Sequence, residues 1–172
     1  MRILVLEDDR VQQGRIEQTL LDIGRSRNLR LEIDIAKNYG DVEKYSQYFD
    51  NYQLYLLDLE IDGERERGFQ VAQQVRERDP FTSIVFVSTH SEVLPLAFRY
   101  HLSALDFISK DQPEADYCHQ LERCLDYVLA VDKRENMRLF TYSFEGRRGF
   151  TLPYHEILAF ETSVESHRIK VY

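Results

Sequence analysis

Five short apolar segments recur along the first three quarters of the chain, and stretches long enough to form helices separate them. The apolar segments are residues 3–6, 29–35, 54–57, 84–87 and 104–108, and the helix-length stretches are 10–26, 39–49, 66–78, 92–101 and 113–134. Apolar strands joined by helical crossovers predict a doubly wound α/β fold, a five-stranded parallel sheet with helices on both faces. Because Arg30, Glu32 and Asp34 interrupt the second segment, we expect that strand at an edge of the sheet.

Polar residues stand where four of these predicted strands end. Glu7 and Asp8 follow the first strand, Asp58 the third, Ser88 the fourth and Lys110 the fifth. The carboxyl ends of parallel strands share one edge of the sheet, and ligands of such folds bind outside that edge. We therefore expect carboxylates, a hydroxyl and a lysine in one crevice.

These residue types favour phosphoryl chemistry with a divalent cation. Carboxylates held close together repel one another, and Mg²⁺ bound through oxygen relieves that repulsion. With a metal on Asp8 and Asp58 and a water on Glu7, one oxygen of Asp58 stays free to attack phosphorus. Lys110 and the hydroxyl of Ser88 would then neutralise and bind phosphoryl oxygens.

Each residue also has a structural interpretation. The acidic run 7–9 is suited to cap the helix that begins near Arg10, Asp58 to cap a turn, and Ser88 to begin the next helix. Lys110 is by default a solvated loop lysine. Four strand ends with suitable residue types favour the functional interpretation over separate caps.

The order of Glu7-Asp8, Asp58, Ser88 and Lys110 resembles the receiver domain of bacterial two-component response regulators, a flavodoxin-like fold that would occupy residues 1–134. The resemblance implies that Asp58 accepts phosphate from a sensor histidine kinase. It implies Mg²⁺ ligands from Asp8, Asp58 and the main-chain carbonyl of Glu60, with Glu7 acting through water.

The same resemblance gives roles to the remaining residues of the pocket. It implies that Ser88 and Lys110 draw inward on phosphorylation and that Phe107 is the switch aromatic, with homodimerisation as the output. The loop 59–68 departs from the family, since it lacks the common Met-Pro and is longer. Lys110 is followed by Asp111 and not directly by proline.

The tail, residues 135–172, resembles a linker and the opening strands of a LytTR-type DNA-binding domain, carried by residues 150–163 and 166–169. His167 and Arg168 are candidate promoter contacts, and the alternative is that both are solvated residues entering a strand. Residues 1–136 carry a formal charge of −9 and residues 137–172 one of +1, so DNA contact is expected from the tail. Because the second domain looks incomplete, we expect weak or absent specific DNA binding by residues 1–172.

Residues 86–92 and 104–108 resemble receivers of the accessory gene regulator and of competence and bacteriocin regulators, which implies control of quorum-sensing genes. The chain has no apolar run long enough to span a membrane and no signal leader, so we expect a cytoplasmic protein. We expect no enzymatic activity beyond its own phosphorylation and dephosphorylation. The alternatives are a phosphorylation-independent pseudo-receiver and a small Mg²⁺-dependent aspartyl phosphatase, which would need an aspartate where Glu60 stands.

Overall fold

The computed structural model describes residues 1–136, 139–144, 148–153, 157–162 and 169–171. The chain divides into two compact units, Met1–Val128 and Leu129–Tyr172. The long helix α5, Glu114–Asn136, contributes to both units. A domain boundary after residue 134 therefore stays a prediction.

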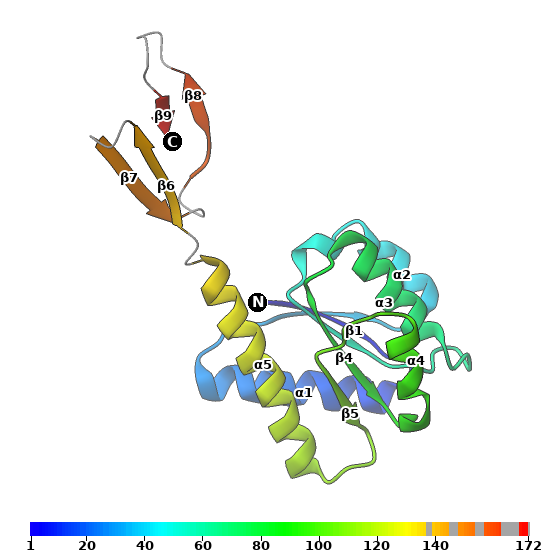
Figure 1. The fold of residues 1–172 in the computed structure, drawn as a ribbon. Helices are drawn as coiled ribbons and strands as arrows, with labels where there is room; N and C mark the ends of the chain where they lie inside the picture. The colour runs from blue at the N-terminus through cyan, green and yellow to red at the C-terminus, as the bar shows by residue number, and fades with distance from the viewer. Residues whose placement is uncertain (137–138, 145–147, 154–156, 163–168, 172) are drawn as a thin grey trace. The chain divides into compact units, whose positions relative to one another are not determined.

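The first unit contains one parallel sheet of five strands in the order β2-β1-β3-β4-β5 (Figure 1). The strands are β1 (Arg2–Leu6), β2 (Glu32–Ala36), β3 (Leu54–Leu57), β4 (Ser83–Ser88) and β5 (Asp106–Ser109). All four strand pairs are parallel. The predicted fold class is confirmed, and β2 lies at an edge as its charged residues indicated.

Helices cover both faces of this sheet. The helices are α1 (Arg10–Arg27), α2 (Tyr39–Ser46), α3 (Arg67–Arg78), α4 (Leu94–Arg99) and α5, with short 3₁₀ turns η1 (Phe49–Asn51) and η2 (Ser91–Val93). α1 and α5 lie on one face, and α2, α3 and α4 lie on the other (Figure 1). Each face encloses its own apolar core, one including Ile16 and Leu121, the other Val42 and Phe69. Within the described residues no helix has both the length and the apolar character needed to cross a membrane.

Two helices are shorter than the sequence predicts. The expected helix 39–49 ends at Ser46, because Phe49 turns its side chain into the core and its carbonyl accepts a hydrogen bond of 2.6 Å from the Tyr55 hydroxyl. The expected helix 92–101 runs only from Leu94 to Arg99. His101 has a φ of 52°, a left-handed conformation that ends a helix.

The second unit contains short antiparallel pairs. Strand β6 (Leu139–Phe144) pairs with β7 (Arg148–Pro153), and β8 (Phe160–Thr162) pairs with β9 (Ile169–Val171). The expected β-rich character of the tail is thus present in its described residues. His167 and Arg168 lie outside the described residues, so their role in DNA binding stays a prediction.

Candidate functional site

An acidic cluster forms where β1 and β3 end. The two strands are neighbours with Leu6 opposite Leu57, so the residues that follow them emerge side by side. The amide of Asp58 donates to the carbonyl of Leu6 at 2.9 Å and locks this register. Carboxylate oxygens of Glu7, Asp8 and Asp58 all lie within 4.8 Å of one another. Glu7 and Asp58 are buried and Asp8 is exposed, so the cluster opens to solvent on one side.

Lys110 completes the cluster from the end of β5. Its Nζ atom lies 2.6 Å from Oδ2 of Asp58 and 2.6 Å from Oε2 of Glu7. Its amide donates to the carbonyl of Ser88 at 3.1 Å, which attaches it to the end of β4. The side chain is 8% exposed, so one ammonium is almost fully enclosed between two carboxylates.

Burial and neighbouring charges shift the pKa values of Glu7 and Lys110. Loss of solvent raises the pKa of Glu7 to about 7, and the nearby ammonium of Lys110 opposes that rise. Burial alone would lower the pKa of Lys110, but the charges of Asp58 and Glu7 outweigh it and raise the pKa. Oε2 of Glu7 is buried and receives no well-aligned hydrogen bond, although the ammonium lies close to it.

The loop between β3 and α3 folds back over the acidic cluster. Asp62 and Gly63 have φ values of 55° and 76°, which make a tight turn flanked by reciprocal hydrogen bonds between Ile61 and Glu64. The amide of Asp62 donates to Oδ2 of Asp8 at 2.9 Å. This loop departs from the family pattern in sequence, and its tight turn still attaches it to the acidic cluster.

Ser88 and Phe107 lie on the adjacent strands β4 and β5. Ser88 is fully buried, and its hydroxyl oxygen accepts a hydrogen bond of 3.3 Å from the amide of His90. Phe107 is half-buried and packs against the core cluster that also holds Phe69. Ser88 therefore lies beside the backbone of Lys110. Phe107 lies against the apolar core on the face that α2, α3 and α4 cover.

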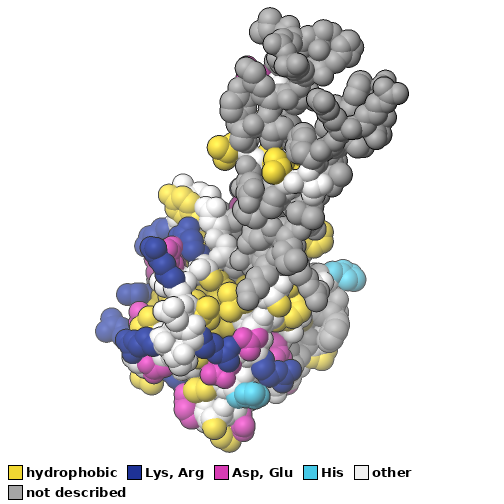
Figure 2. Space-filling model, turned by 90° about the vertical axis from the view of Figure 1, so that its left-hand side faces the viewer, with side chains coloured by type: hydrophobic (Ala, Val, Ile, Leu, Met, Phe, Trp, Pro, Cys, Tyr) yellow, Lys and Arg dark blue, Asp and Glu magenta, His cyan; other side chains and the backbone are white. Residues whose placement is uncertain are grey.

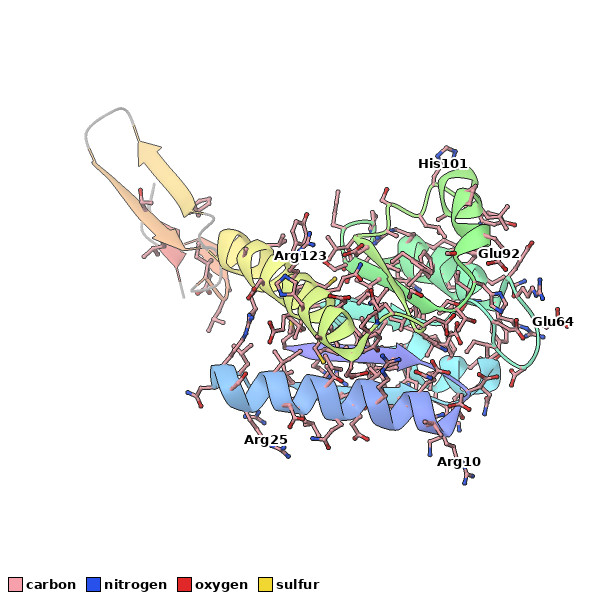
Figure 3. The ribbon with its side chains drawn as sticks, turned by 90° about the horizontal axis from the view of Figure 1, so that it is seen from below. Arg10, Arg25, Glu64, Glu92, His101 and Arg123 are labelled. Carbon is pink, nitrogen blue, oxygen red and sulfur yellow. The ribbon has the colours of Figure 1, made fainter. Side chains whose placement is uncertain are left out.

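A bridge of side chains that the sequence did not indicate links two loops beside the cluster. Nε2 of His90 lies 2.8 Å from Glu60, and Nδ1 lies 2.9 Å from Glu92. The bridge joins the β3–α3 loop to the β4–α4 loop. In Figure 3, the labelled Glu64 and Glu92 lie at the same end of the sheet as Arg10, whereas Arg25 lies at the other. The acidic cluster, the bridge and the start of α1 thus share the carboxyl edge of the sheet.

The acidic run 7–9 serves two purposes. Oδ1 of Asp9 accepts hydrogen bonds of 2.9 Å from the amides of Val11 and Gln12, so Asp9 caps α1. Oε1 of Glu7 accepts from the amide of Asp9 at 3.1 Å, and its other oxygen faces Lys110. The capping interpretation therefore holds for Asp9, while Glu7 and Asp8 belong to the acidic cluster.

A five-stranded parallel sheet with this cluster at its carboxyl edge defines a receiver-type signalling domain. Residues 3–122 match the response regulator receiver domain, and the chain belongs to that family. It is 29% identical over 173 aligned positions to accessory gene regulator protein A of Staphylococcus epidermidis, covering 98% of this chain and 72% of that protein.

Solved structures agree on the fold. A response regulator receiver protein from Pseudoalteromonas atlantica superposes with a TM-score of 0.62 at 16% identity, covering 77% of this chain and 99% of that one. NtrX from Brucella abortus, solved in complex with ADP, gives a TM-score of 0.60 at 22% identity over 83% of this chain. The present chain spans only 31% of NtrX, so the similarity concerns the fold of one part of NtrX.

Proposed function

We propose that this chain is a phosphorylation-controlled response regulator in which Asp58 accepts a phosphoryl group from the phosphohistidine of a sensor kinase. The observation that carries the proposal is the position of Lys110, whose ammonium lies 2.6 Å from both Asp58 and Glu7. A lysine held there is suited to neutralise charge that gathers on a phosphoryl group at Asp58. Membership of the receiver family supports the same role.

The residues present fit a magnesium ion. All donors in the acidic cluster are carboxylate oxygens, which hard divalent cations prefer, and the exposed position of Asp8 leaves the cluster open to an ion from solvent. Asp8, Asp58 and the main-chain carbonyl of Glu60 would hold the ion, with Glu7 acting through water. When bound, Mg²⁺ would neutralise phosphoryl oxygens and orient them for transfer.

The transfer itself exchanges one bond for another. The bond between phosphorus and the donor histidine nitrogen breaks while a bond forms between phosphorus and a carboxylate oxygen of Asp58, and the electron pair of the broken bond stays on nitrogen. Lys110 supplies positive charge to the transferred group. The hydroxyl of Ser88, which now accepts from the amide of His90, would donate to a phosphoryl oxygen after the β4–α4 loop moves.

The output follows from the elements that carry Ser88 and Phe107. Movement of Ser88 toward the phosphoryl group would shift the end of β4. The side chain of Phe107, on the paired strand β5, would then turn inward. The surface of α4, β5 and α5 would change as a result. We propose that this change promotes homodimerisation.

We further propose that residues 135–172 are a linker and the N-terminal portion of a LytTR-type domain that binds promoter DNA and controls quorum-sensing genes of the competence or bacteriocin type. Proteins named accessory gene regulator protein A are similar to this chain over 98% of its length. Residues 1–136 carry a formal charge of −9, and on the face drawn in Figure 2 the described basic side chains are mixed with acidic ones. A surface of mixed sign on these acidic residues is unsuited to phosphate binding, which supports placing DNA contacts in the tail, residues 137–172.

Intact mass after incubation with acetyl phosphate and Mg²⁺ tests the phosphorylation step. The proposal predicts one phosphoryl adduct that disappears in the Asp58→Ala variant and when the metal is chelated. Absence of an adduct, under conditions that label a known receiver, would favour a pseudo-receiver. Multiple turnovers of a phosphate ester would favour an aspartyl phosphatase.

A further inference from the structure

We propose that Arg15 is a positioning residue for Lys110, holding the β5–α5 loop so that the ammonium stays between the carboxylates of Asp58 and Glu7. This inference rests on the proposed function, because it assigns Arg15 a part in phosphoryl transfer to Asp58. Arg15 lies on α1, the helix that begins directly after the acidic run 7–9.

Among the described residues, the guanidinium of Arg15 contacts three residues of the segment that follows β5. Its Nη1 atom donates to the main-chain carbonyl of Lys110 at 2.8 Å. Its Nε and Nη2 atoms lie 2.9 and 2.8 Å from Oε2 of Glu114, at the start of α5. The carbon of the guanidinium stands 4.0 Å from the ring centre of Tyr117, one turn further along that helix.

This set of contacts fixes the guanidinium in one orientation. The Arg15 side chain is 19% exposed, and the Tyr117 ring beneath it is fully buried. The planar guanidinium stacks on an aromatic ring through its face and donates to two oxygens along its edges. These contacts leave it little freedom to rotate. The carbonyl of Lys110 therefore has a rigid donor.

In the described part of the chain, the backbone of Lys110 is held from two sides. β5 is an edge strand that pairs only with β4, and the amide of Lys110 reaches the carbonyl of Ser88 from that side. Arg15 holds the carbonyl of the same residue from α1. α1 and α5 cover the same face of the sheet (Figure 1), and the ion pair between Arg15 and Glu114 joins them. Arg15 thus joins the helix that follows Glu7 and Asp8 to the loop that carries Lys110.

A double-mutant cycle measures this coupling. The rate constant of phosphorylation is measured by intact mass against acetyl phosphate concentration at saturating Mg²⁺, for wild type, Arg15→Gln, Lys110→Met and the double variant. We expect Arg15→Gln to lower the maximal rate roughly tenfold with little change in the half-saturating donor concentration, since misplacing a group that acts at the transition state slows the chemical step. In the Lys110→Met background, the same substitution should change the rate less than about twofold.

Arg27→Gln is the matched control. Arg27 also joins α1 to α5, lying 3.3 Å from Glu122 and pairing with Asp126, but none of its described contacts reaches the Lys110 loop. Arg27→Gln should lower the phosphorylation rate by less than about twofold in both the wild-type and the Lys110→Met background. If Arg15→Gln fails to fold by circular dichroism, Arg15→Lys takes its place, since one ammonium cannot supply the same fork of donors.

The outcomes separate the two proposals. A wild-type protein that takes up no phosphate would overturn the proposed function and this inference with it. A wild type that is phosphorylated, with Arg15→Gln at the wild-type rate, would overturn this inference alone. If Arg15→Gln lowers the phosphorylation rate by the same factor in the wild-type and the Lys110→Met background, the inference is also overturned, because Arg15 then acts independently of Lys110.

Discussion

The carbonyl oxygen of Asp58 lies 2.1 Å from the point that a Cβ atom on Gly68 would occupy. The carbonyl carbon of Asp58 and the Cα atom of Leu59 each lie 2.9 Å from that point. All three are backbone atoms, so no side-chain rotation makes room. The amide of Gly68 donates to the carbonyl of Leu59 at 3.2 Å. The first turn of α3 therefore rests directly on the segment that carries the proposed phosphoacceptor.

Gly68→Ala should consequently damage both stability and phosphorylation. Forcing a methyl group against fixed backbone costs roughly 1–3 kcal/mol, and the displaced segment is the one that holds Asp58. Urea denaturation should show the lower free energy of unfolding, and intact mass the slower labelling. Gly14→Ala is the control, because a Cβ atom at this position in the second turn of α1 would meet nothing within 4 Å. It should stabilise by about 0.5–1 kcal/mol, and equal stability of both variants would refute the argument.

Glu7 should make stability fall as pH rises in metal-free buffer. Burial raises its pKa to about 7 from an ordinary 4.5, so between these values the folded chain holds a proton that the unfolded chain releases. Glu7 therefore contributes up to about 3 kcal/mol to the free energy of unfolding. This contribution is complete below pH 4.5 and is lost as pH rises through 7.

Glu7→Gln isolates this contribution from the other carboxylates. The free energy of unfolding of wild type minus that of Glu7→Gln should decrease between about pH 5 and about pH 8, measured by urea denaturation in EDTA. Added Mg²⁺ should reduce the decrease, because a cation favours the ionised carboxylate. A difference that stays constant or grows with pH would show that the Glu7 pKa is not raised.

The bridge through His90 should restrain two loops without adding much global stability. His90→Ala removes contacts of 2.8 Å to Glu60 and 2.9 Å to Glu92, all of them partly exposed, so unfolding should change by less than about 1 kcal/mol. Amide hydrogen exchange at Glu60 and His90 should nevertheless become faster. Arg65→Ala is the control, since Arg65 reaches Glu60 only at 3.7 Å and is largely exposed. Unchanged exchange in His90→Ala would mean that the bridge holds neither loop.

Arg76 should be a major stabilising residue at the opposite end of the sheet. It donates to the carbonyls of Leu102 and Thr82 at 2.7 Å each, and to those of Ser103 and Asp79 at 3.2 and 3.3 Å. Arg76→Met leaves these acceptors unpaired and should lower the free energy of unfolding by roughly 3 kcal/mol in urea denaturation. Arg78→Met, at an exposed position on the same helix, should change it little. Similar losses in both variants would contradict the role of the carbonyls.

The sheet could be predicted from the sequence because its central strands are buried on both faces. The run 54–57 coincides with β3, where all four residues are buried. The expected strand 29–35 was less accurate, since β2 begins at Glu32. The amide of Leu29 instead donates to the carbonyl of Gly24 at 2.8 Å, after Asn28 ends α1 in a left-handed conformation. Leu29, whose apolar character suggested a strand, thus forms part of the C-terminal cap of α1.

The candidate site was predictable only where strand ends determine it. Glu7, Asp8, Asp58 and Lys110 lie within two residues of the end of an apolar run, and the sheet brings them together. Arg15 reaches a carbonyl 95 positions away in the sequence, so nothing near it indicated its partner. Contacts of this kind depend on how α1 and α5 pack, which a single sequence does not encode in a local pattern.

Trapping the phosphoryl group at one residue tests the central claim most directly. Borohydride reduces an aspartyl phosphate to homoserine, and peptide mass spectrometry then locates the changed residue. After treatment with acetyl phosphate and Mg²⁺, we predict homoserine at position 58, none at Asp8 or Asp9, and none anywhere without the metal. Homoserine at another aspartate, or phosphate retained on Ser88, would contradict the assignment of Asp58 as the phosphoacceptor.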